Sequence, residues 1–296
     1  MHSARLSSSA NDISAAEWDA CAGGANPFVS HAFISALEDS GSAVAQAGWG
    51  PAHLVIDGAD GRPAGILPAW LKSHSQGEYV FDHGWADAFQ RAGGRYYPKL
   101  QIAVPFTPVP GPRLLTRDPA LRPALIGAAE AAVERFGLSS AHATFIDEDE
   151  VTAFESAGWL IRVGQQFHWS NRGYADFDAF LGDLASRKRK AIRRERAAAV
   201  EGVEIEHVSG AALTEAHWDA FWGFYQDTGA RKWGQPYLTR AFFTLLAERM
   251  ADKVLLILAR REDRYIAGAL NLIGADALYG RYWGCSEDRP FLHFEL

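Results

Sequence analysis

The stretch that decides the fold occurs twice, as GRPAGIL at Gly61–Leu67 and as RYIAGAL at Arg264–Leu270. Each copy follows an apolar run and a turn of charged and small residues, and this pattern predicts the second strand of a β-hairpin. A third predicted strand comes after each hairpin. Two copies of one α/β unit, roughly 200 residues apart, would explain the pattern. The alternative is that two ordinary hairpins happen to contain small residues at the same place.

Working outward from the first copy, the sequence predicts a disordered polar tail over residues 1–12 and two short helices on either side of GGANP. The remaining elements predicted for this half are strands over 53–57 and 63–71, a strand from Lys99, a helix over 119–137, and strands in SAHATFID and WLIRVGQQFHWS. Together they define a first domain over residues 13–170.

The second half, residues 171–296, is predicted to begin with a helix over about 176–201. A strand in VEIEHV follows, and then helices in AHWDAFWGFYQDTG and LTRAFFTLLAERMA. Three strands with two tight turns come after Val254. Both halves therefore share the order of helices, hairpin and third strand.

Composition restricts the class of protein. A chain of 296 residues favours two domains. The net charge of -7 argues against a general nucleic-acid binder, which carries a basic excess. The two cysteines lie far apart, no apolar core of a secretory signal precedes the first helix, and no apolar run approaches a membrane span. We expect a cytoplasmic protein.

Four long stretches resemble one bacterial family. They are NPFVSHAFISALEDSGS, GEYVFDHGWADAFQRAGGRYYPKLQIAVPFTPVPGPRLL, RKRKAIRRER and LYGRYWGCSEDRPFLHFEL. The chain resembles the FemAB-like, GNAT-related acyltransferases. The resemblance implies an α/β (α+β) fold of two tandem GNAT-like (acyl-CoA N-acyltransferase) domains. It also implies transfer of an acyl or aminoacyl group to an amine acceptor, such as a peptidoglycan precursor, with acyl-CoA or aminoacyl-tRNA as donor.

Two features depart from a standard GNAT pattern. The loop that would cradle the CoA pyrophosphate in the first half is PFTPVPGPRLL, and its prolines at 105, 108, 110 and 112 have no N–H to offer a phosphate. The chain also stops at LHFEL, before a second GNAT domain is complete. We therefore expect the second domain to be truncated or to be completed by a partner.

The most concentrated charge lies in SRKRKAIRRER, where seven of the ten residues from Arg187 to Arg196 are basic. On a helical wheel, Leu184, Ala191, Ile192 and Ala199 form an apolar stripe, with one cationic row on each side. The rows hold the predicted substrate-binding residues Arg187, Arg189, Lys190, Arg193 and Arg194. Like charges at this spacing repel one another, which favours an anionic partner. The alternative is a solvated charged face.

A second candidate is DHGWADAFQRAGGRYYPKL, a mixture of aromatic and polar groups suited to a pocket. Its candidate substrate-binding residues are Asp82, Trp85, Tyr96, Tyr97 and Lys99. Lys99 precedes an apolar strand and could reach a phosphate or carboxylate. The alternative is an ordinary aromatic core with a surface histidine, His83.

The C-terminal stretch supplies the remaining candidates. Arg281, Tyr282 and Trp283 lie on a predicted strand and are candidate substrate contacts. His293 and Glu295 follow on a predicted helix, where either could take the proton that an amine loses. Two residues apart, they diverge on a helix, so only one could be the base. The alternative is that His293 caps or packs.

One further candidate is the loop RKWGQPYL, with Lys232, Trp233 and Tyr237, whose alternative is a plain interhelical turn. No metal-ligand spacing occurs, so we expect no metal. Three hypotheses follow: an acyltransferase acting on a phosphate-bearing small molecule, a non-catalytic GNAT-fold binding protein for a phosphate-bearing ligand, and a protein that contacts tRNA through the basic helix.

Overall fold

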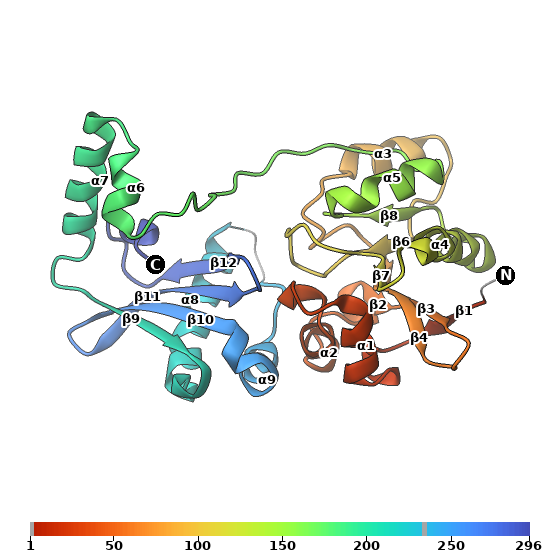
Figure 1. Cartoon of the computed structure of the whole chain (residues 1–296), viewed down its shortest axis with the longest axis horizontal. Helices are drawn as coiled ribbons and strands as arrows, with labels where there is room; N and C mark the ends of the chain where they lie inside the picture. Colours follow the sequence, from red (N-terminus) through yellow and green to blue (C-terminus); the bar gives the residue numbers. More distant parts are fainter. Residues whose placement is uncertain (1–2, 233–235) are drawn as a thin grey trace. The chain divides into compact units, whose positions relative to one another are not determined.

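The computed structural model describes residues 3–232 and 236–296 (Figure 1). The chain divides into two compact units. Unit 1 comprises Met1–Ile161, Pro236–Val254 and Leu272–Tyr279, and unit 2 comprises Arg162–Gln235, Leu255–Asn271 and Gly280–Leu296. Both units mix helices and sheets, so the fold is of the mixed α/β class that the sequence predicts.

Unit 1 contains two sheets of four strands. The first has the order β1-β3-β4-β7, with β1 at Ala4–Ser7, β3 at His53–Asp57, β4 at Pro63–Leu67 and β7 at Leu115–Thr116. The second has the order β2-β5-β6-β8, with β2 at Trp49–Pro51, β5 at Ala69–Lys72, β6 at Lys99–Ile102 and β8 at Ala141–Ala143. The pair β6–β8 is parallel, and β2–β5 and β5–β6 are antiparallel.

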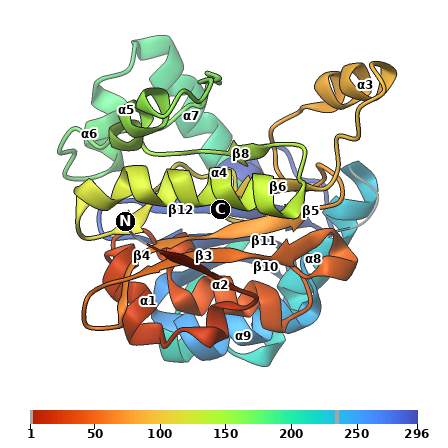
Figure 2. The same ribbon diagram turned by 90° about the vertical axis from the view of Figure 1, so that its right-hand side faces the viewer.

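The helices of unit 1 are α1 (Ala15–Ala22), α2 (His31–Asp39), α3 (His83–Arg91), α4 (Arg122–Phe136), α5 (Glu148–Ser156) and α9 (Arg240–Met250). Serines at 14 and 30 cap the N-termini of α1 and α2 through their hydroxyls. Figure 2 shows α4 lying along the sheets, whereas α3 stands at the end of two extended connections. The core between α4 and the sheets is built from Leu54, Ile56, Leu67, Leu100, Ile102, Leu125, Ile126 and Phe154.

Unit 2 centres on a sheet with the order β12-β11-β10-β9. Its strands are β9 (Glu204–Ser209), β10 (Val254–Arg261), β11 (Arg264–Ile273) and β12 (Leu278–Cys285), and its helices are α6 (Phe177–Gly182), α7 (Ser186–Ala199) and α8 (Glu215–Lys232). Short 3-10 turns occur along the chain at Ala10–Asp12, Pro27–Val29, Ala45–Ala47, Pro119–Leu121, Gly210–Ala212, Ala251–Lys253 and Leu292–Phe294.

The two predicted hairpins are confirmed, because β3 pairs with β4 and β10 neighbours β11. Their third strands behave differently. The expected single strand over 63–71 is interrupted at Pro68, and β5 joins another sheet, whereas β12 extends the sheet of its own hairpin. Proline cannot donate to a strand ladder, which explains the interruption.

Other predictions were wrong in detail. Within the expected polar tail, β1 pairs with β3, and the Glu38 carboxylate accepts hydrogen bonds from Ser9 and from the Ala10 N–H. The helix expected over 176–201 is two helices, since Asp176 caps α6 and the backbone of Ala185 is extended. The strand expected in WLIRVGQQFHWS is absent from this described stretch, where the segment is irregular and Val163 and Phe167 are largely exposed. A strand pattern needs a paired edge as well as suitable residues.

Candidate functional site

A buried cluster of charged side chains lies in unit 1, where β5 and β6 run side by side. The Lys99 Nζ donates to Asp82 Oδ2 at 2.6 Å, to Glu78 Oε2 at 2.9 Å and to Ser75 Oγ at 3.0 Å. The Tyr96 hydroxyl also donates to Asp82 Oδ2, at 2.8 Å. Lys99 is completely buried, and Glu78 and Asp82 are each 4% exposed. Ionised groups at this depth are stable only when they are paired and hydrogen-bonded, as these are.

A second buried lysine borders the cluster. Lys72 pairs in register with Lys99 across β5 and β6. Its Nζ lies 3.6 Å from the centroid of the Trp49 ring and donates to the Gln76 carbonyl at 3.2 Å. A cation over an aromatic face is attracted by the negative face of the ring. We call Lys72, Ser75, Glu78, Asp82, Tyr96, Tyr97 and Lys99 the buried ion cluster.

The two carboxylates of the buried ion cluster have pKa values shifted in opposite directions. Burial acts to raise the pKa of Asp82, but hydrogen bonds from Lys99 and its neighbours outweigh this effect and lower the pKa to about 2. Burial raises the pKa of Glu78 despite the attraction of Lys99 and Lys72. Glu78 Oε1 and Asp82 Oδ1 are buried without a hydrogen-bond partner among the described residues. The cluster thus shifts the pKa values of its two carboxylates in opposite directions, downward for Asp82 and upward for Glu78.

The lysine and the nearby histidine are also shifted. Burial, with the repulsion of Lys99, lowers the pKa of Lys72 to about 7, although Glu78 and Asp82 oppose the shift. Burial and then Lys99 lower the pKa of His142 on β8 to about 4. Perturbed groups gathered in one place are a feature of functional sites, although structural ion pairs produce them too.

The structure brings together four of the five residues predicted in this stretch: Asp82, Tyr96, Tyr97 and Lys99. Trp85 lies instead on α3 with its side chain 58% exposed. Sequence reasoning missed Lys72, Ser75 and Glu78. The sequence does contain a signal for Lys72. This lysine ends an apolar predicted strand, and the strand at KLQI begins with another lysine, which is an unusual pattern.

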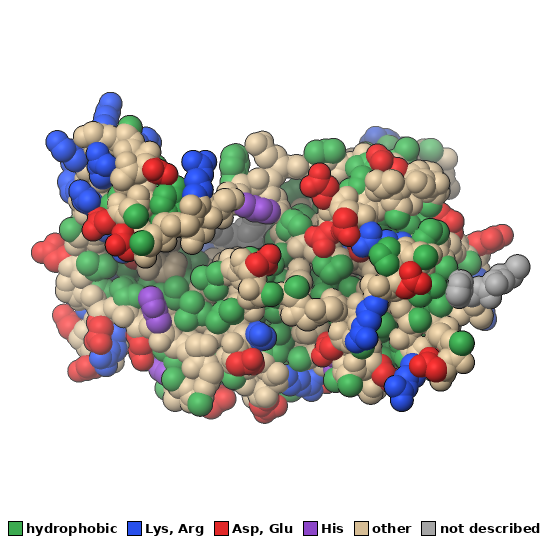
Figure 3. All heavy atoms as spheres, viewed as in Figure 1, with side chains coloured by type: hydrophobic (Ala, Val, Ile, Leu, Met, Phe, Trp, Pro, Cys, Tyr) green, Lys and Arg blue, Asp and Glu red, His purple; other side chains and the backbone are tan. Residues whose placement is uncertain are grey.

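The cationic helix α7 lies in unit 2, and Lys and Arg side chains gather over it (Figure 3). The row of Arg189, Arg193 and Arg196 contacts other residues of unit 2. Arg189 donates to the Gly182 carbonyl, Arg193 pairs with Asp178 at 2.9 Å, and Arg196 pairs with Glu295 at 2.9 Å. Arg196 also lies 3.9 Å over the Phe177 ring.

The opposite row of α7 makes no such contacts. Arg187, Lys190 and Arg194 are exposed, and none has an ion-pair or hydrogen-bond partner in the part of the chain that the structure describes. Their spacing of three and four residues places them on one face of the helix. We call these three residues the free row. These three side chains are available to an anion.

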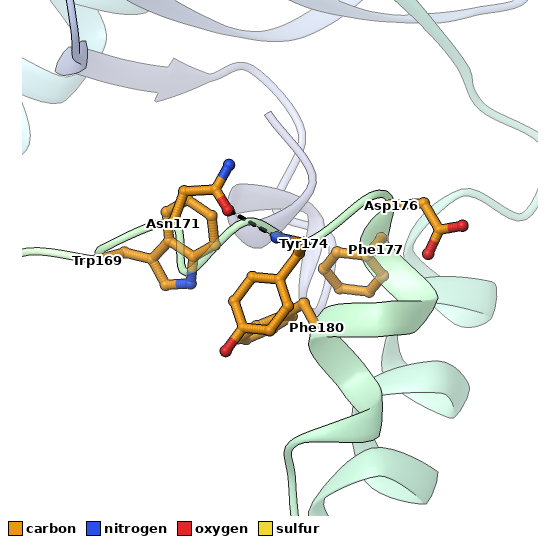
Figure 4. A pocket seen from close by; sticks show the side chains of 6 residues that line it. All are labelled: Trp169, Asn171, Tyr174, Asp176, Phe177 and Phe180. Atoms are coloured by element: carbon orange, nitrogen blue, oxygen red, sulfur yellow. Dashed lines mark hydrogen bonds between the residues drawn. The ribbon is translucent and has the colours of Figure 1, made fainter.

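An aromatic pocket that the sequence did not predict precedes α7. It has a volume of about 380 Å³ and is lined by Trp169, Asn171, Tyr174, Asp176, Phe177 and Phe180 (Figure 4). The side-chain Oδ1 of Asn171 accepts hydrogen bonds from the N–H groups of Gly173 and Tyr174, which shapes the turn. Asp176 accepts from the Ala179 N–H, so both polar side chains serve the local fold.

The C-terminal candidates have structural contacts. Tyr282 packs edge-on against Tyr225, and the Arg281 guanidinium lies 4.9 Å from the Tyr282 ring. His293 is exposed and contacts the rings of Trp283 and Phe294. The expected helix is only a 3-10 turn at Leu292–Phe294, and the Glu295 carboxylate is paired with Arg196. These C-terminal candidates belong to unit 2, whereas the residues of the buried ion cluster belong to unit 1.

The loop RKWGQPYL lies partly outside the described residues, which include neither Trp233 nor the side chain of Lys232. Tyr237 stacks on Phe106 with a centroid distance of 5.1 Å. Among the described residues, no group of three or more His, Cys, Asp or Glu side chains could hold a metal ion. The helices in that part of the chain include none that is long and apolar enough to cross a membrane.

A family model described as peptidoglycan biosynthesis/recognition, FemAB-like, matches residues 9–296. The chain belongs to the FemAB-like family. The resemblance seen in the four sequence stretches is thereby confirmed. The matched region of this FemAB-like protein includes the buried ion cluster, the aromatic pocket and the free row.

A solved structure supports the fold of this FemAB-like chain. The structure of L-PGS from Bacillus licheniformis is similar with a TM-score of 0.52 and 11% sequence identity, over 92% of this chain and 71% of that one. At this identity the likeness concerns the fold alone. No curated protein matches the FemAB-like chain by sequence.

Proposed function

We propose that this FemAB-like protein transfers an acyl or aminoacyl group to an amine carried by a peptidoglycan precursor, using two tandem GNAT-like domains over residues 13–170 and 171–296. The family description, which names peptidoglycan biosynthesis or recognition, supports the class of acceptor. A precursor or donor linked to a nucleotide or to tRNA would place the reaction in the cytoplasm.

The observation that carries the proposal is the free row of α7. Three exposed cations with no internal partner among the described residues repel one another, and an anionic ligand relieves that repulsion. Arginine presents a planar fork of donors that matches phosphate oxygens. The free row therefore binds the phosphates of the donor or of the acceptor.

The proline-rich loop bears on the choice of donor. The buried Arg113 guanidinium donates to the carbonyls of Val109, Gly111 and Pro112. The loop therefore turns its carbonyls inward, and its prolines have no N–H to offer a pyrophosphate. This arrangement favours aminoacyl-tRNA over acyl-CoA as the donor.

The test compares two charge-reversed variants. Arg187→Glu, Lys190→Glu and Arg194→Glu together remove the free row. Arg62→Glu, Arg135→Glu and Lys253→Glu make the same change of charge at exposed positions of unit 1 and serve as the control.

Binding of acetyl-CoA, aminoacyl-tRNA and a UDP-linked cell-wall precursor to both variants and to the wild type is measured by calorimetry or filter retention. We expect one of them to bind the wild type at roughly micromolar Kd, about -8 kcal/mol. The free-row variant should lose binding at least 100-fold, and the control should not. Equal binding by both variants would refute the phosphate role.

A second candidate is a binding protein that retains the fold without the chemistry. The ion pair between Glu295 and Arg196 favours it, because this candidate base is already engaged in a contact within unit 2. Mass spectrometry separates the two functions. A transferase converts the precursor to a heavier product in the presence of its donor, whereas a binding protein shows affinity without turnover. Binding to tRNA alone, with steep salt dependence, would indicate an RNA-contacting role.

A further inference from the structure

We propose that the aromatic pocket before α7 binds the nucleobase of the phosphate-bearing ligand. The inference rests on the proposed phosphate role of the free row, and it assigns a second part of the same ligand to a second site. Each ligand considered above carries a nucleobase as well as phosphates, whether it is a UDP-linked precursor, aminoacyl-tRNA or acetyl-CoA. A protein that binds the phosphates of any of them gains affinity and selectivity by also holding the base.

Four aromatic rings form the walls of the pocket, from Trp169, Tyr174, Phe177 and Phe180 (Figure 4). They contact one another edge-on or tilted, with ring centroids 5.6 to 6.2 Å apart. Trp169 and Phe177 nevertheless remain 64% and 43% exposed. Stacking on an exposed aromatic face is favourable for every nucleobase, because each base has a π-face.

The size of the pocket suits one nucleoside. Its volume of about 380 Å³ lies near the lower end of the range for small-molecule sites, about 300–1,000 Å³. Space of this size accommodates one base with its sugar rather than an extended lipid or peptide chain.

Asn171 adds a polar group to the aromatic walls. Its Oδ1 accepts from the N–H groups of Gly173 and Tyr174, at 3.0 Å each, and these bonds fix the orientation of the side-chain amide. The Nδ2 atom carries two hydrogens and donates to no group among the described residues. Nucleobases present carbonyl oxygens and ring nitrogens at their edges. The amide therefore offers a donor to the edge of a base whose face meets the rings.

Cations lie beside the pocket. Arg172 is exposed and has no ion-pair or hydrogen-bond partner within residues 3–232 and 236–296. Arg196 of α7 lies 3.9 Å over the Phe177 ring, and Arg193 of α7 pairs with Asp178 of α6 at 2.9 Å. The helix that supplies two walls of the pocket is thus joined to the cationic helix. A base linked to phosphates matches this combination of rings and positive charge.

A cationic ligand is the other occupant that four rings suggest. The nearby carboxylates do not favour it, because Asp176 accepts from the Ala179 N–H and Asp183 accepts from the Tyr174 hydroxyl at 2.6 Å. The guanidinium of Arg196 already covers Phe177, and Arg172 adds a second positive charge. These arginines repel another cation, whereas an uncharged base meets no such repulsion.

The experiment measures the binding of UDP, ADP and inorganic pyrophosphate to the whole chain by calorimetry. The three probes share two linked phosphates, and only the nucleotides add a base and a ribose. The wild type should bind at least one nucleotide about tenfold or more tightly than pyrophosphate. Trp169→Ala should weaken binding of that nucleotide about 5- to 150-fold and leave the affinity for pyrophosphate unchanged. The free-row variant should lose affinity for all three probes.

Phe167→Ala is the matched control. Phe167 lies two residues before Trp169, is 91% exposed and does not line the pocket, so its loss should leave nucleotide binding unchanged. Trp169→Phe keeps a ring for stacking and should bind within a few-fold of the wild type. Tighter binding of UDP assigns the pocket to the UDP-linked acceptor. Tighter binding of ADP assigns it to an adenine-bearing donor, and titration with acetyl-CoA and aminoacyl-tRNA then identifies which donor.

The outcomes separate this inference from the proposed function. A Trp169→Ala protein with wild-type affinity for the nucleotides refutes the base site and leaves the phosphate role standing. A wild type that binds the nucleotides no more tightly than pyrophosphate does the same. If Trp169→Ala does not fold, as judged by circular dichroism, equal quenching of tryptophan fluorescence by the nucleotides in the wild type and in Trp169→Phe refutes the base site. A wild type that binds neither these probes nor the three full ligands refutes the phosphate role and, with it, this inference.

Discussion

Lys99 and Asp82 form a buried ion pair, with 2.6 Å between Lys99 Nζ and Asp82 Oδ2 and almost no access of either side chain to solvent. The lysine begins β6, and the aspartate directly precedes α3. Glu78 shares the same ammonium at 2.9 Å. The connection from β5 to α3 is therefore held to the sheet by one cation, and its geometry depends on that cation.

Removing the cation should destabilise the protein strongly. Lys99→Met preserves the length of the side chain but leaves two buried carboxylates without their partner, which costs about 3–5 kcal/mol. Urea denaturation followed by circular dichroism measures the loss. Lys188→Met, at an exposed position of α7, should change the free energy of unfolding by less than about 0.5 kcal/mol. Equal stability of the two variants would show that the carboxylates are not charged in the folded protein.

The pKa of Lys72 predicts a rise of stability with pH. Burial lowers this pKa from 10.5 to about 7 in the folded protein. Between these values the unfolded chain binds more protons than the folded chain, so the free energy of unfolding increases as pH rises from 7 toward 10. One group contributes at most about 1.4 kcal/mol per pH unit. The groups facing the amine are Glu78, Asp82 and Lys99.

Denaturation between pH 7 and 9.5 measures this rise. Lys72→Met should abolish it, and Lys253→Met, at an exposed position of the same unit, should not. A Lys72→Met protein with the pH slope of the wild type would mean that another group is responsible.

The buried ion cluster could be predicted in part. The stretch from Asp82 to Lys99 drew attention because it mixes aromatic and charged residues, and four of its five candidates meet in the structure. Glu78 and Lys72 were missed because their burial depends on pairing across β5 and β6, which no local pattern records. The sequence favours Trp85 as an aromatic side chain that could line the same pocket, but on the short helix α3 it is exposed.

The basic helix shows a different limit of sequence reasoning. The wheel correctly placed two cationic rows beside an apolar stripe. It could not show that Arg193 forms an ion pair with Asp178 and Arg196 with Glu295, because these partners lie 15 and 99 residues away along the chain. The hairpins were predictable because strand alternation and turn residues are local. The assignment of β5 to a second sheet was not, because it depends on the partners of the strand.

The occupied row predicts a small loss of stability. Arg196→Ala removes an ion pair with the largely buried Glu295 and a contact with the Phe177 ring, together worth about 1–2 kcal/mol. Arg194→Ala, from the free row, should lie within about 0.5 kcal/mol of the wild type. Thermal denaturation of both variants measures the difference. A larger loss for Arg194→Ala would mean that the free row has a structural partner.

Gly77 predicts a steric effect close to the buried ion cluster. Its φ is +79°, and an added Cβ would lie 2.6 Å from the Phe106 ring and 3.3 Å from Trp49 Nε1. Gly93 has a similar φ of +85° but no atom within 4 Å of an added Cβ. Both Gly→Ala variants pay for the left-handed backbone, about 1 kcal/mol. Only Gly77→Ala adds a clash with packed rings, for a further 1–3 kcal/mol or so. Urea denaturation should therefore give Gly77→Ala a lower free energy of unfolding than Gly93→Ala. The Gly77→Ala substitution should also shift the tryptophan fluorescence of the folded protein, because Trp49 borders the clash. Equal stability of the two variants would mean that Phe106 moves aside at no cost.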